Sequence, residues 1–290
     1  MVGNEILIAH CGPHFGEEPP ISGSRGSGNI FFSSCNLKCI YCQNYQISHQ
    51  RTGNRYDIEG LVDIFFSLES QGVHNINLVS PTPYIPFIAT AIREAKEKGI
   101  MIPFLYNTNA YENVEALELL KGLIDIYVPD FKYASHRIGK LLSDAQEYPA
   151  WAKKAIFEMK AQVGNLAING GIASKGLLIR HLVLPNSLSG SREVVAWIKD
   201  KLGPDTYLSL MAQFLPLHEA SIYPMLGRII TKDEYNPILE LLSEHGFENV
   251  FVQELESAPL YVPDFLKEEP FQTEGTGQGA RRVATTLIAF

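Results

Sequence analysis

The sequence has 290 residues, enough to bury the core of one large α/β domain. Hydrophobic residues make up 46% of it, which excludes a mostly disordered chain. The net charge of −8 argues against a protein that coats nucleic acid, so nucleic acid is not an expected partner.

From residue 29 onward, short apolar runs alternate with amphipathic segments. Apolar residues at helical spacing predict helices, and the short apolar runs between them predict strands. Strands are expected at 29–32, 75–79, 100–106, 123–128, 177–184 and 206–211, with a further one at 249–254. Helices are expected at 57–72, 84–98, 113–121, 150–163, 191–202 and 233–245.

This regular alternation predicts a parallel sheet, because two parallel strands need a crossover connection that is usually a helix. Six strand–helix units are two fewer than a closed eightfold barrel contains. The expected fold class is therefore α/β, a partial (β/α)6 TIM-like barrel with parallel strands and outer helices. Chemistry is expected at the carboxyl ends of the strands. A flat, doubly wound sheet is the alternative.

One domain is expected, with a segment on each side of it. The three regions are an N-terminal loop or flap at 1–28, the partial barrel at 29–256, and a C-terminal extension at 257–290 that ends in a loose tail. The polar segment 14–28 is rich in glycine and proline. It is expected to be either an ordered surface loop or a flap at the barrel mouth, with Glu17, Glu18 and Arg25 near the substrate.

Three of the four cysteines lie within eight residues, in the stretch "SSCNLKCIYCQN". Cys35, Cys39 and Cys42 have the spacing Cys-x3-Cys-x2-Cys, directly after the first expected strand. Clustered thiolates are ligands for zinc or for iron–sulfur clusters. A [4Fe–4S] cluster held by three thiolates keeps one iron open, which makes it a reaction site.

Structural zinc is the alternative for these thiols. Such a site needs a fourth ligand, and the candidates are Cys11, His10 and His49. None of them lies at the regular spacing of a zinc finger, and the chain has only one Cys-x2-Cys pair. Cys11 is therefore expected to be a buried or free thiol.

The cysteine pattern, with the aromatic Tyr41 before the last cysteine, resembles the radical S-adenosylmethionine (SAM) enzymes. The resemblance implies a [4Fe–4S] cluster and SAM as cofactors. In that family the amino and carboxylate groups of SAM occupy the open iron. The partial (β/α)6 barrel of the family agrees with the strand count above.

Within this superfamily, the chain is similar to the pyruvate formate-lyase activating enzymes, and most of all to an uncharacterised branch of their homologues. The similarity rests on "HFGEEPPISGSRGSGNIFF", "NTNAY", "PDFKY", "IRHLVLP" and "FLPLHE", and covers residues 14 to 272. It implies that the SAM-binding residues are Tyr41, Pro81, Thr82, Asn107, Asn109, Asp130, Lys132, Arg180 and His218. It names no catalytic residue.

The residues after the expected strands also make chemical sense by themselves. Asp130 and Lys132 lie on one face of a strand, where they could contact SAM or form a surface ion pair. Arg180 lies within an apolar strand and needs an anionic ligand or a buried carboxylate. Asn107 and Asn109 could instead be turn residues. His218 could equally be a histidine in a solvated loop.

The chain departs from the family at the turn after the second expected strand. The family has Gly-Gly-Glu there, and this chain has Ser80-Pro81-Thr82-Pro83. In the family this segment offers acceptors to the SAM ammonium group. Proline lacks an N–H but keeps its carbonyl, so an acceptor is still available.

The expected function is reductive cleavage of SAM to a 5′-deoxyadenosyl radical that abstracts hydrogen from an unidentified target. The resemblance implies a glycyl-radical-type partner protein as the target and an electron donor of the flavodoxin or ferredoxin type. One alternative is radical SAM modification of a peptide, RNA or small molecule. Another is an iron–sulfur electron-transfer module without SAM chemistry, although three ligands rather than four argue against it.

The expected location is the cytoplasm. The N-terminus lacks the basic and apolar regions of a signal peptide. No run of about 18 apolar residues is present, so no membrane partner is expected. Three clustered cysteines are not a disulfide framework, which favours a reducing compartment.

Overall fold

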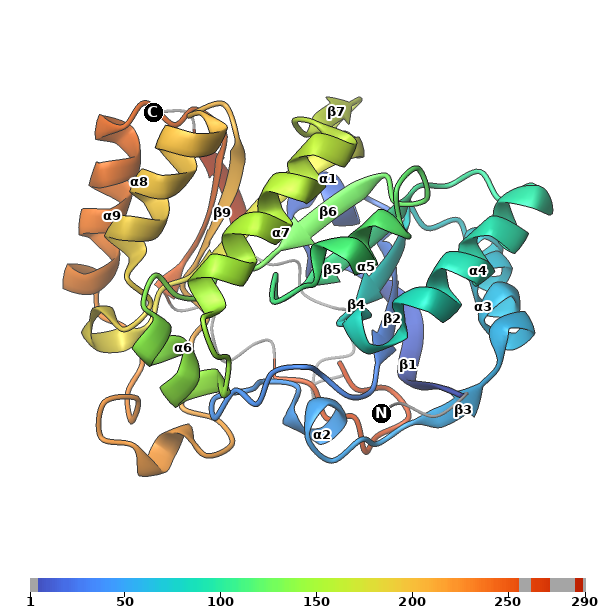
Figure 1. The fold of residues 1–290 in the computed structure, drawn as a ribbon, viewed down its shortest axis with the longest axis horizontal. Helices are drawn as coiled ribbons and strands as arrows, with labels where there is room; N and C mark the ends of the chain where they lie inside the picture. The colour runs from blue at the N-terminus through green and yellow to red at the C-terminus, as the bar shows by residue number, and fades with distance from the viewer. Residues whose placement is uncertain (1–4, 256–261, 272–284, 289–290) are drawn as a thin grey trace.

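The short apolar runs form the strands of one large sheet, and the amphipathic segments form helices outside it (Figure 1). This arrangement comes from a computed structural model, which describes residues 5–255, 262–271 and 285–288. The strands run in the order β11-β10-β9-β8-β6-β5-β4-β2-β1-β3, and β7 pairs with β8. The seven strands from β2 to β10 on this path are parallel, each to its neighbour.

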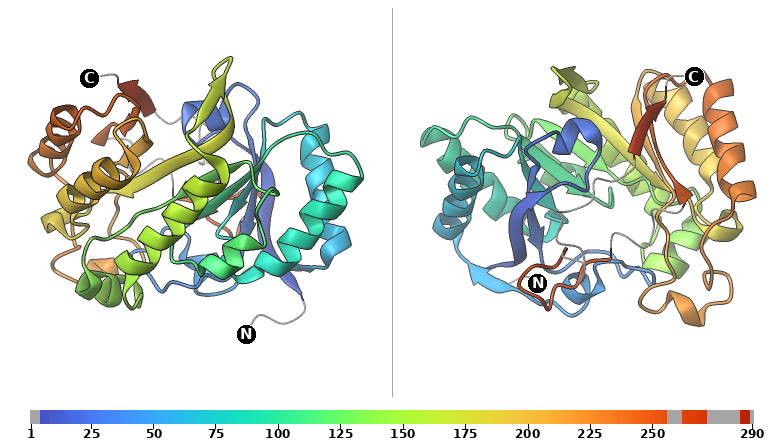
Figure 2. Two further views of the ribbon diagram at one scale, coloured as in Figure 1. Left: turned by 45° about the horizontal axis from the view of Figure 1, so that its top comes forward. Right: turned by 180° about the vertical axis from the view of Figure 1, so that it is seen from behind.

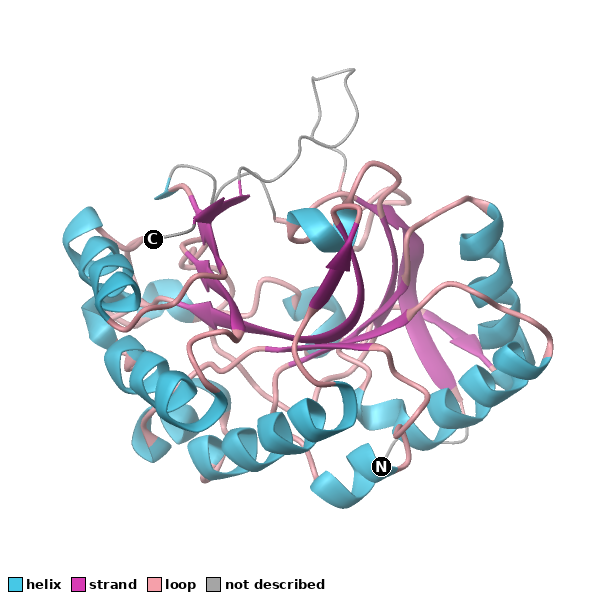
Figure 3. Cartoon of the chain, turned by 90° about the horizontal axis from the view of Figure 1, so that it is seen from above, coloured by secondary structure: helices cyan, strands magenta, loops and turns pink. Residues whose placement is uncertain are grey.

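Seen from above, the sheet curves around a central space, and the helices follow its outer side (Figure 3). The parallel strands are β2 (Ser27–Phe32), β4 (Ile76–Val79), β5 (Phe104–Thr108), β6 (Ile126–Pro129), β8 (Ile172–Leu182), β9 (Tyr207–Met211) and β10 (Val250–Gln253). The others are β1 (Ile6–His14), β3 (Asn54–Tyr56), β7 (Ala167–Asn169) and β11 (Thr285–Ile288). The α/β partial barrel predicted from the sequence is confirmed, including the further strand near residue 250.

Several helices begin at a capping residue or end at a glycine, both of which can be recognised in the sequence. The helices are α1 (Pro19–Ser22), α2 (Tyr45–Ser48), α3 (Ile58–Ser70), α4 (Ile85–Glu97), α5 (Val114–Glu118), α6 (His136–Ser143), α7 (Tyr148–Val163), α8 (Ser191–Leu202) and α9 (Lys232–Glu244). The Asp57 side chain accepts a hydrogen bond from Gly60 N at the start of α3. Thr231 and Glu234 form a capping box on α9. Gly203, with φ 93°, follows α8 in a conformation that suits glycine.

Strand boundaries differ from the prediction where the sequence is irregular. The strand expected at 100–106 begins only at Phe104, because Pro103 has no N–H to donate to a neighbour. The Pro103 carbonyl still accepts a hydrogen bond from Ile76 N at 2.9 Å. The short elements α2, α6, β3 and β7 were not predicted, since none is long enough to show a periodic pattern.

The N-terminal region is not the loop or flap that the sequence predicted. β1 pairs antiparallel with β2 along its length, and its start pairs with β3. The Gly12-Pro13 pair within β1 hides the strand from a pattern-based prediction. β2 is the last strand of the parallel part of the sheet, so β1 can pair with it in the antiparallel direction without a crossover helix.

The segment after β1 lies at the opposite end of the barrel from the predicted mouth. His14 pairs with Ser27, which begins β2, whereas the cysteine loop follows the other end of β2. The short blue helix α1 lies at the end where β2 begins in both views of Figure 2. Its Ile21 packs against Leu105 and Ile126 in the interior. The segment is therefore not a flap at the mouth, since α1 and the residues before it fill the end where the parallel strands begin. Glu17 and Glu18 nevertheless line the cavity, as expected, whereas Arg25 does not.

The C-terminal region is only partly the loose tail that the sequence predicted. β11 pairs antiparallel with β10 and extends the sheet. In the segment 262–271, Phe265 is 5% exposed and packs with Phe31, Ile47 and Val79. The remaining residues of the predicted extension and tail lie outside the described part of the chain. Among the helices that the structure describes, none is long and apolar enough to cross a membrane.

Candidate active site

The three clustered cysteines lie in the loop that follows β2, and all three line one cavity of about 270 Å³. A turn at Ser34, with φ 76°, directs this loop across the carboxyl ends of the parallel strands. The loop backbone is held there, because Ser34 N donates to Ile47 O and Lys38 N donates to Ser143 O, each at 2.9 Å. The cavity therefore lies where the barrel fold places chemistry.

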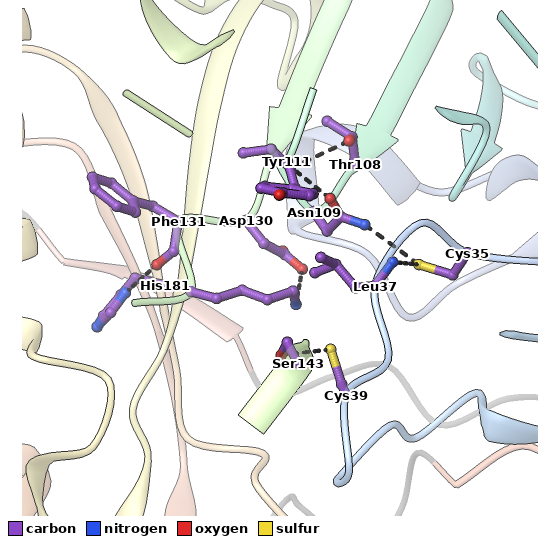
Figure 4. Close-up of polar contacts among 12 residues, drawn as sticks. Cys35, Leu37, Cys39, Thr108, Asn109, Tyr111, Asp130, Phe131, Ser143 and His181 are labelled. Carbon is purple, nitrogen blue, oxygen red and sulfur yellow. Dashed lines mark hydrogen bonds and ion pairs between the residues drawn. The ribbon is translucent and has the colours of Figure 1, made fainter. Parts of the chain in front are cut away.

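Each clustered thiol has a side-chain hydrogen-bond partner from a different element. Asn109 Nδ2, after β5, donates to Cys35 Sγ at 3.4 Å. Ser143 Oγ, at the end of α6, lies 3.0 Å from Cys39 Sγ (Figure 4). The third pair is Cys42 Sγ with Ser48 Oγ of α2, at 3.1 Å. Such partners orient ligands and tune the group they hold.

These thiols fit an iron–sulfur cluster better than a single ion. Within the described residues, no three His, Cys, Asp or Glu side chains are close enough to hold one metal ion. A cluster distributes its ligands over several irons, so its thiolates stand further apart than the ligands of one ion. Burial raises the pKa of Cys35 and Cys39 to about 11, so a bound cation is what would keep them as thiolates.

The candidate fourth zinc ligands do not complete the cysteine cluster. Cys11 is a half-buried free thiol on β1 and is not among the residues that line the cavity. The His10 ring packs against Phe271, with centroids 5.9 Å apart. His49 lies beside the loop, but its ring contacts His218 rather than a cysteine sulfur. Structural zinc is therefore not supported.

Asp130 and Lys132 directly follow β6 and form an ion pair, with Nζ 2.7 Å from Oδ2. Their side chains are 21% and 16% exposed, so this is not the surface ion pair that the sequence left open. Burial lowers the pKa of Lys132, but Asp130, Cys39 and Tyr148 together raise it by more, so the ammonium group stays charged. Both residues line the cavity.

Tyr148, at the start of α7, fixes the ends of two strands. The sequence did not predict this role for Tyr148. Its hydroxyl lies 2.7 Å from Asp130 O, 2.9 Å from Asn109 O and 2.8 Å from Lys132 N. The hydroxyl thereby sets the positions of the loops after β5 and β6 relative to each other. Tyr148 starts a helix far from any motif, so no local signal in the sequence could reveal this role.

Arg180 has the buried carboxylates that its apolar surroundings require. Its Nε donates to Glu18 Oε1 at 2.8 Å, and its terminal nitrogen contacts both Glu17 and Glu18. Burial raises the pKa of Glu17, but Arg180 and His14 lower it by more. The net pKa is below its usual value, so the carboxylate stays ionised. These residues form the floor of the cavity, next to the amino-terminal end of the barrel that α1 fills.

The structure brings most predicted SAM-binding residues to the cavity, but not all. Those that line it are Tyr41, Asn107, Asn109, Asp130, Lys132 and Arg180. Ser80 also lines it, whereas Pro81 and Thr82 do not, and Thr82 Oγ1 instead donates to buried Glu112. His218 lies outside the lining, with its ring stacked on Tyr45.

The chain matches known proteins in sequence and in fold. Residues 29–172 match the model of the radical SAM superfamily. An uncharacterised protein of Methanocaldococcus jannaschii is 29% identical over 247 residues. A second relative, 7-carboxy-7-deazaguanine synthase of Methanothermobacter thermautotrophicus, is 26% identical over 151 residues. These alignments cover 82% and 51% of the chain.

Solved structures share the fold at low sequence identity. SuiB of Streptococcus suis bound to S-adenosylmethionine aligns with 78% of the chain at a TM-score of 0.54 and 14% identity. The FeFe-hydrogenase maturase HydG of Carboxydothermus hydrogenoformans aligns with 73% at a TM-score of 0.51 and 15% identity. The chain spans 50% and 49% of these proteins, and 67% and 59% of the two sequence relatives.

Proposed function

We propose that the chain is a radical SAM enzyme, which cleaves SAM reductively and uses the resulting radical to abstract hydrogen from a bound target, because residues 29–172 match the model of that superfamily. Members of this family bind a [4Fe–4S] cluster and SAM. The observation that carries the proposal is the cavity itself. Its lining contains the three clustered cysteines together with the ion pair of Asp130 and Lys132.

Cys35, Cys39 and Cys42 would hold the cluster through three thiolates, which leaves one iron for the amino and carboxylate groups of SAM. When bound, the [4Fe–4S] cluster would supply the electron that cleaves SAM to methionine and a 5′-deoxyadenosyl radical. The chain holds the two reactants in contact and keeps water away from them. The buried rings of Phe214 and Phe31 form apolar parts of the cavity wall, which help to exclude water.

The polar residues of the lining can bind the rest of SAM. Lys132 offers ammonium donors to a carboxylate, and Asp130 can accept hydrogen bonds from ribose hydroxyl groups. Asn107 and Asn109 add amide groups that both donate and accept. The carbonyl oxygen of Ser80, which lines the cavity, is the candidate acceptor for the SAM ammonium group.

For the target, we propose a glycine of a partner enzyme, with an electron donor of the flavodoxin or ferredoxin type. The support is the set of motifs after the strands that resemble the activating enzymes. A reducing cytoplasm suits the clustered thiols. Peptide modification is a second candidate, because the fold is shared with SuiB, which has been crystallised with its precursor peptide SuiA.

The test is anaerobic reconstitution with iron and sulfide, followed by reduction and measurement of 5′-deoxyadenosine formed from SAM. We expect the wild type and Cys11→Ala to bind the cluster and form 5′-deoxyadenosine, because Cys11 lies outside the cavity lining. We expect Cys35→Ala, Cys39→Ala and Cys42→Ala to lose both.

Two outcomes would contradict the proposal. If Cys11→Ala lost the cluster as fully as Cys39→Ala, the cluster would have four protein ligands and no open iron. If the reconstituted wild type held its cluster and cycled between redox states without consuming SAM, the protein would be an electron-transfer module instead.

A further inference from the structure

The last residues of α6 run beside the cysteine loop and are bonded to it. Lys38 N donates to Ser143 O, and Ile40 N donates to Leu142 O, both at 2.9 Å. These two bonds bracket Cys39 in the sequence of the loop. They place the Ser143 side chain, which is fully buried, against the Cys39 sulfur (Figure 4).

A chain of buried hydroxyl groups continues from Ser143 away from the sulfur. The Tyr133 hydroxyl lies 2.6 Å from Ser143 Oγ, and the Tyr41 hydroxyl bonds to that of Tyr133. The exposed fraction is 0% for Tyr133 and 8% for Tyr41. The chain thus begins in the cysteine loop at Tyr41, crosses to the segment after β6, and returns through α6 to Cys39.

The direction of these hydrogen bonds follows from counting protons. Each hydroxyl has one proton, and a metal-bound thiolate has none, so it can only accept. Ser143 must then donate to Cys39 Sγ and can only accept from Tyr133. Tyr133 in turn accepts from Tyr41. All three dipoles point toward one sulfur, and hydrogen bonds aligned in this way strengthen one another.

Cys39 differs in this respect from the other two ligands. Cys35 receives donors from Asn109 Nδ2 and Leu37 N, each at 3.4 Å, and Cys42 has Ser48 at 3.1 Å. In the part of the chain that the structure describes, no other thiol is the end of a chain of hydroxyl groups. The environment of the three thiols is therefore unequal.

We propose that Ser143, Tyr133 and Tyr41 are positioning residues that raise the reduction potential of the cluster through Cys39. The inference rests on the function proposed above only in assigning Cys39 as a ligand. An added electron increases the negative charge on the ligand sulfurs, and a donor stabilises that reduced form more than the oxidised form. Hydrogen bonds to the sulfurs are among the factors that set the potentials of such clusters.

The experiment compares the midpoint potentials of the reconstituted wild type with those of Ser143→Ala, Tyr133→Phe and Tyr41→Phe. An anaerobic redox titration followed by electron paramagnetic resonance gives the potential without turnover of SAM. We expect all three variants to have lower potentials. The decrease is expected to be largest for Ser143→Ala and smallest for Tyr41→Phe, because each step along the chain lies further from the sulfur.

Two matched variants serve as controls for the loss of a buried hydroxyl. Ser191→Ala removes a buried serine hydroxyl that bonds to His181 at 2.9 Å, away from the thiols. Tyr127→Phe removes a buried tyrosine hydroxyl that donates to Gln162 at 2.7 Å. Both are expected to keep the wild-type potential. A role of Ser143 in folding alone would move the melting temperature without moving the potential.

A Ser143→Ala variant with full iron content and the wild-type potential would overturn the proposal. If this variant failed to hold its cluster, Tyr133→Phe would decide, because it leaves Ser143 and the α6 backbone unchanged. A lowered potential there supports the proposal, and an unchanged one rejects it. A wild type that holds a cluster but forms no 5′-deoxyadenosine would refute the function above, while the potentials would still judge this inference.

Discussion

Lys132 and Asp130 show how one pair of residues can serve both the fold and a ligand. The pair is mostly buried, but it faces the cavity, so either charge can meet water when its partner is removed. A fully buried charge that loses its partner costs about 3–5 kcal/mol, and an exposed pair contributes about 0–1 kcal/mol. The stability effect of breaking this pair should lie between the two.

For this pair we predict that stability and SAM affinity separate in a double variant. Asp130→Asn or Lys132→Met alone should lower the melting temperature, because each leaves one charge without its partner. Asp130→Asn combined with Lys132→Met should recover most of that loss. The affinity for SAM, measured with the cluster present, should stay reduced about tenfold to a hundredfold in all three, as expected for about 1.5–3 kcal/mol. Recovery of affinity in the double variant would mean that the pair is structural.

Glu112 is another buried carboxylate, and it lies outside the lining of the cavity. Its Oε1 accepts hydrogen bonds from Thr82, Tyr106 and Thr108, while its Oε2, also buried, has no partner in the described structure. Burial raises the pKa of Glu112 to about 7 from a usual value of 4.5. The Glu112 carboxyl group therefore binds its proton more tightly in the folded protein than in the unfolded chain.

This shift predicts a pH-dependent contribution to stability. A carboxyl group whose folded pKa is raised stabilises the fold fully below 4.5, and the contribution is lost as the pH rises through about 7. The full effect corresponds to about 3 kcal/mol. Glu112→Gln should therefore gain stability relative to the wild type between pH 5 and pH 8, measured by urea unfolding. Glu115→Gln, at an exposed position, is the control, and parallel curves for the wild type and Glu112→Gln would contradict the prediction.

At the scale of elements, the segment 262–271 closes one side of the cavity. Pro263 and Phe271 belong to the lining, and Phe265 packs against the inner face of β2. Gln46 of α2 holds the segment through two hydrogen bonds, to Asp264 Oδ1 at 2.9 Å and from Phe265 N at 2.7 Å. The sequence after residue 256 has no periodic pattern, so this packing could not be predicted from it.

We predict that Phe265→Ala releases this segment while the barrel stays folded. Truncation of a buried phenylalanine removes about 3–5 kcal/mol of packing, which here belongs to the segment rather than to the main core. Limited proteolysis should then cut near 262–271 much faster than in the wild type, with little change in the unfolding of the barrel. Leu266→Ala is the matched control, since Leu266 is 71% exposed. Equal cleavage rates for the two variants would refute this role of Phe265.

For the whole molecule, the sequence predicts features that repeat along the chain, such as the βα units, and features contained in one short segment, such as the cysteine motif. The alternation of strands and helices predicts the parallel sheet because each βα unit carries its own signal. Cys35, Cys39 and Cys42 are recognisable because they lie within one loop. The partners of Arg180 could not be assigned, because Glu17 and Glu18 lie 163 and 162 residues away in the chain. Ser143 was missed for the same reason, since only the folded backbone brings α6 to Cys39.

The filled amino-terminal end of the barrel has a consequence for the order of events. Ile21 and its neighbours occupy that end, and Glu17, Glu18 and Arg180 form the floor above them. In the described part of the chain, this end is therefore not a route to the floor, and we expect a target to enter the cavity from another side. If entry is across the cysteine loop, we expect a target group that binds between SAM and the floor to arrive before SAM and to leave only after the fragments of SAM have gone.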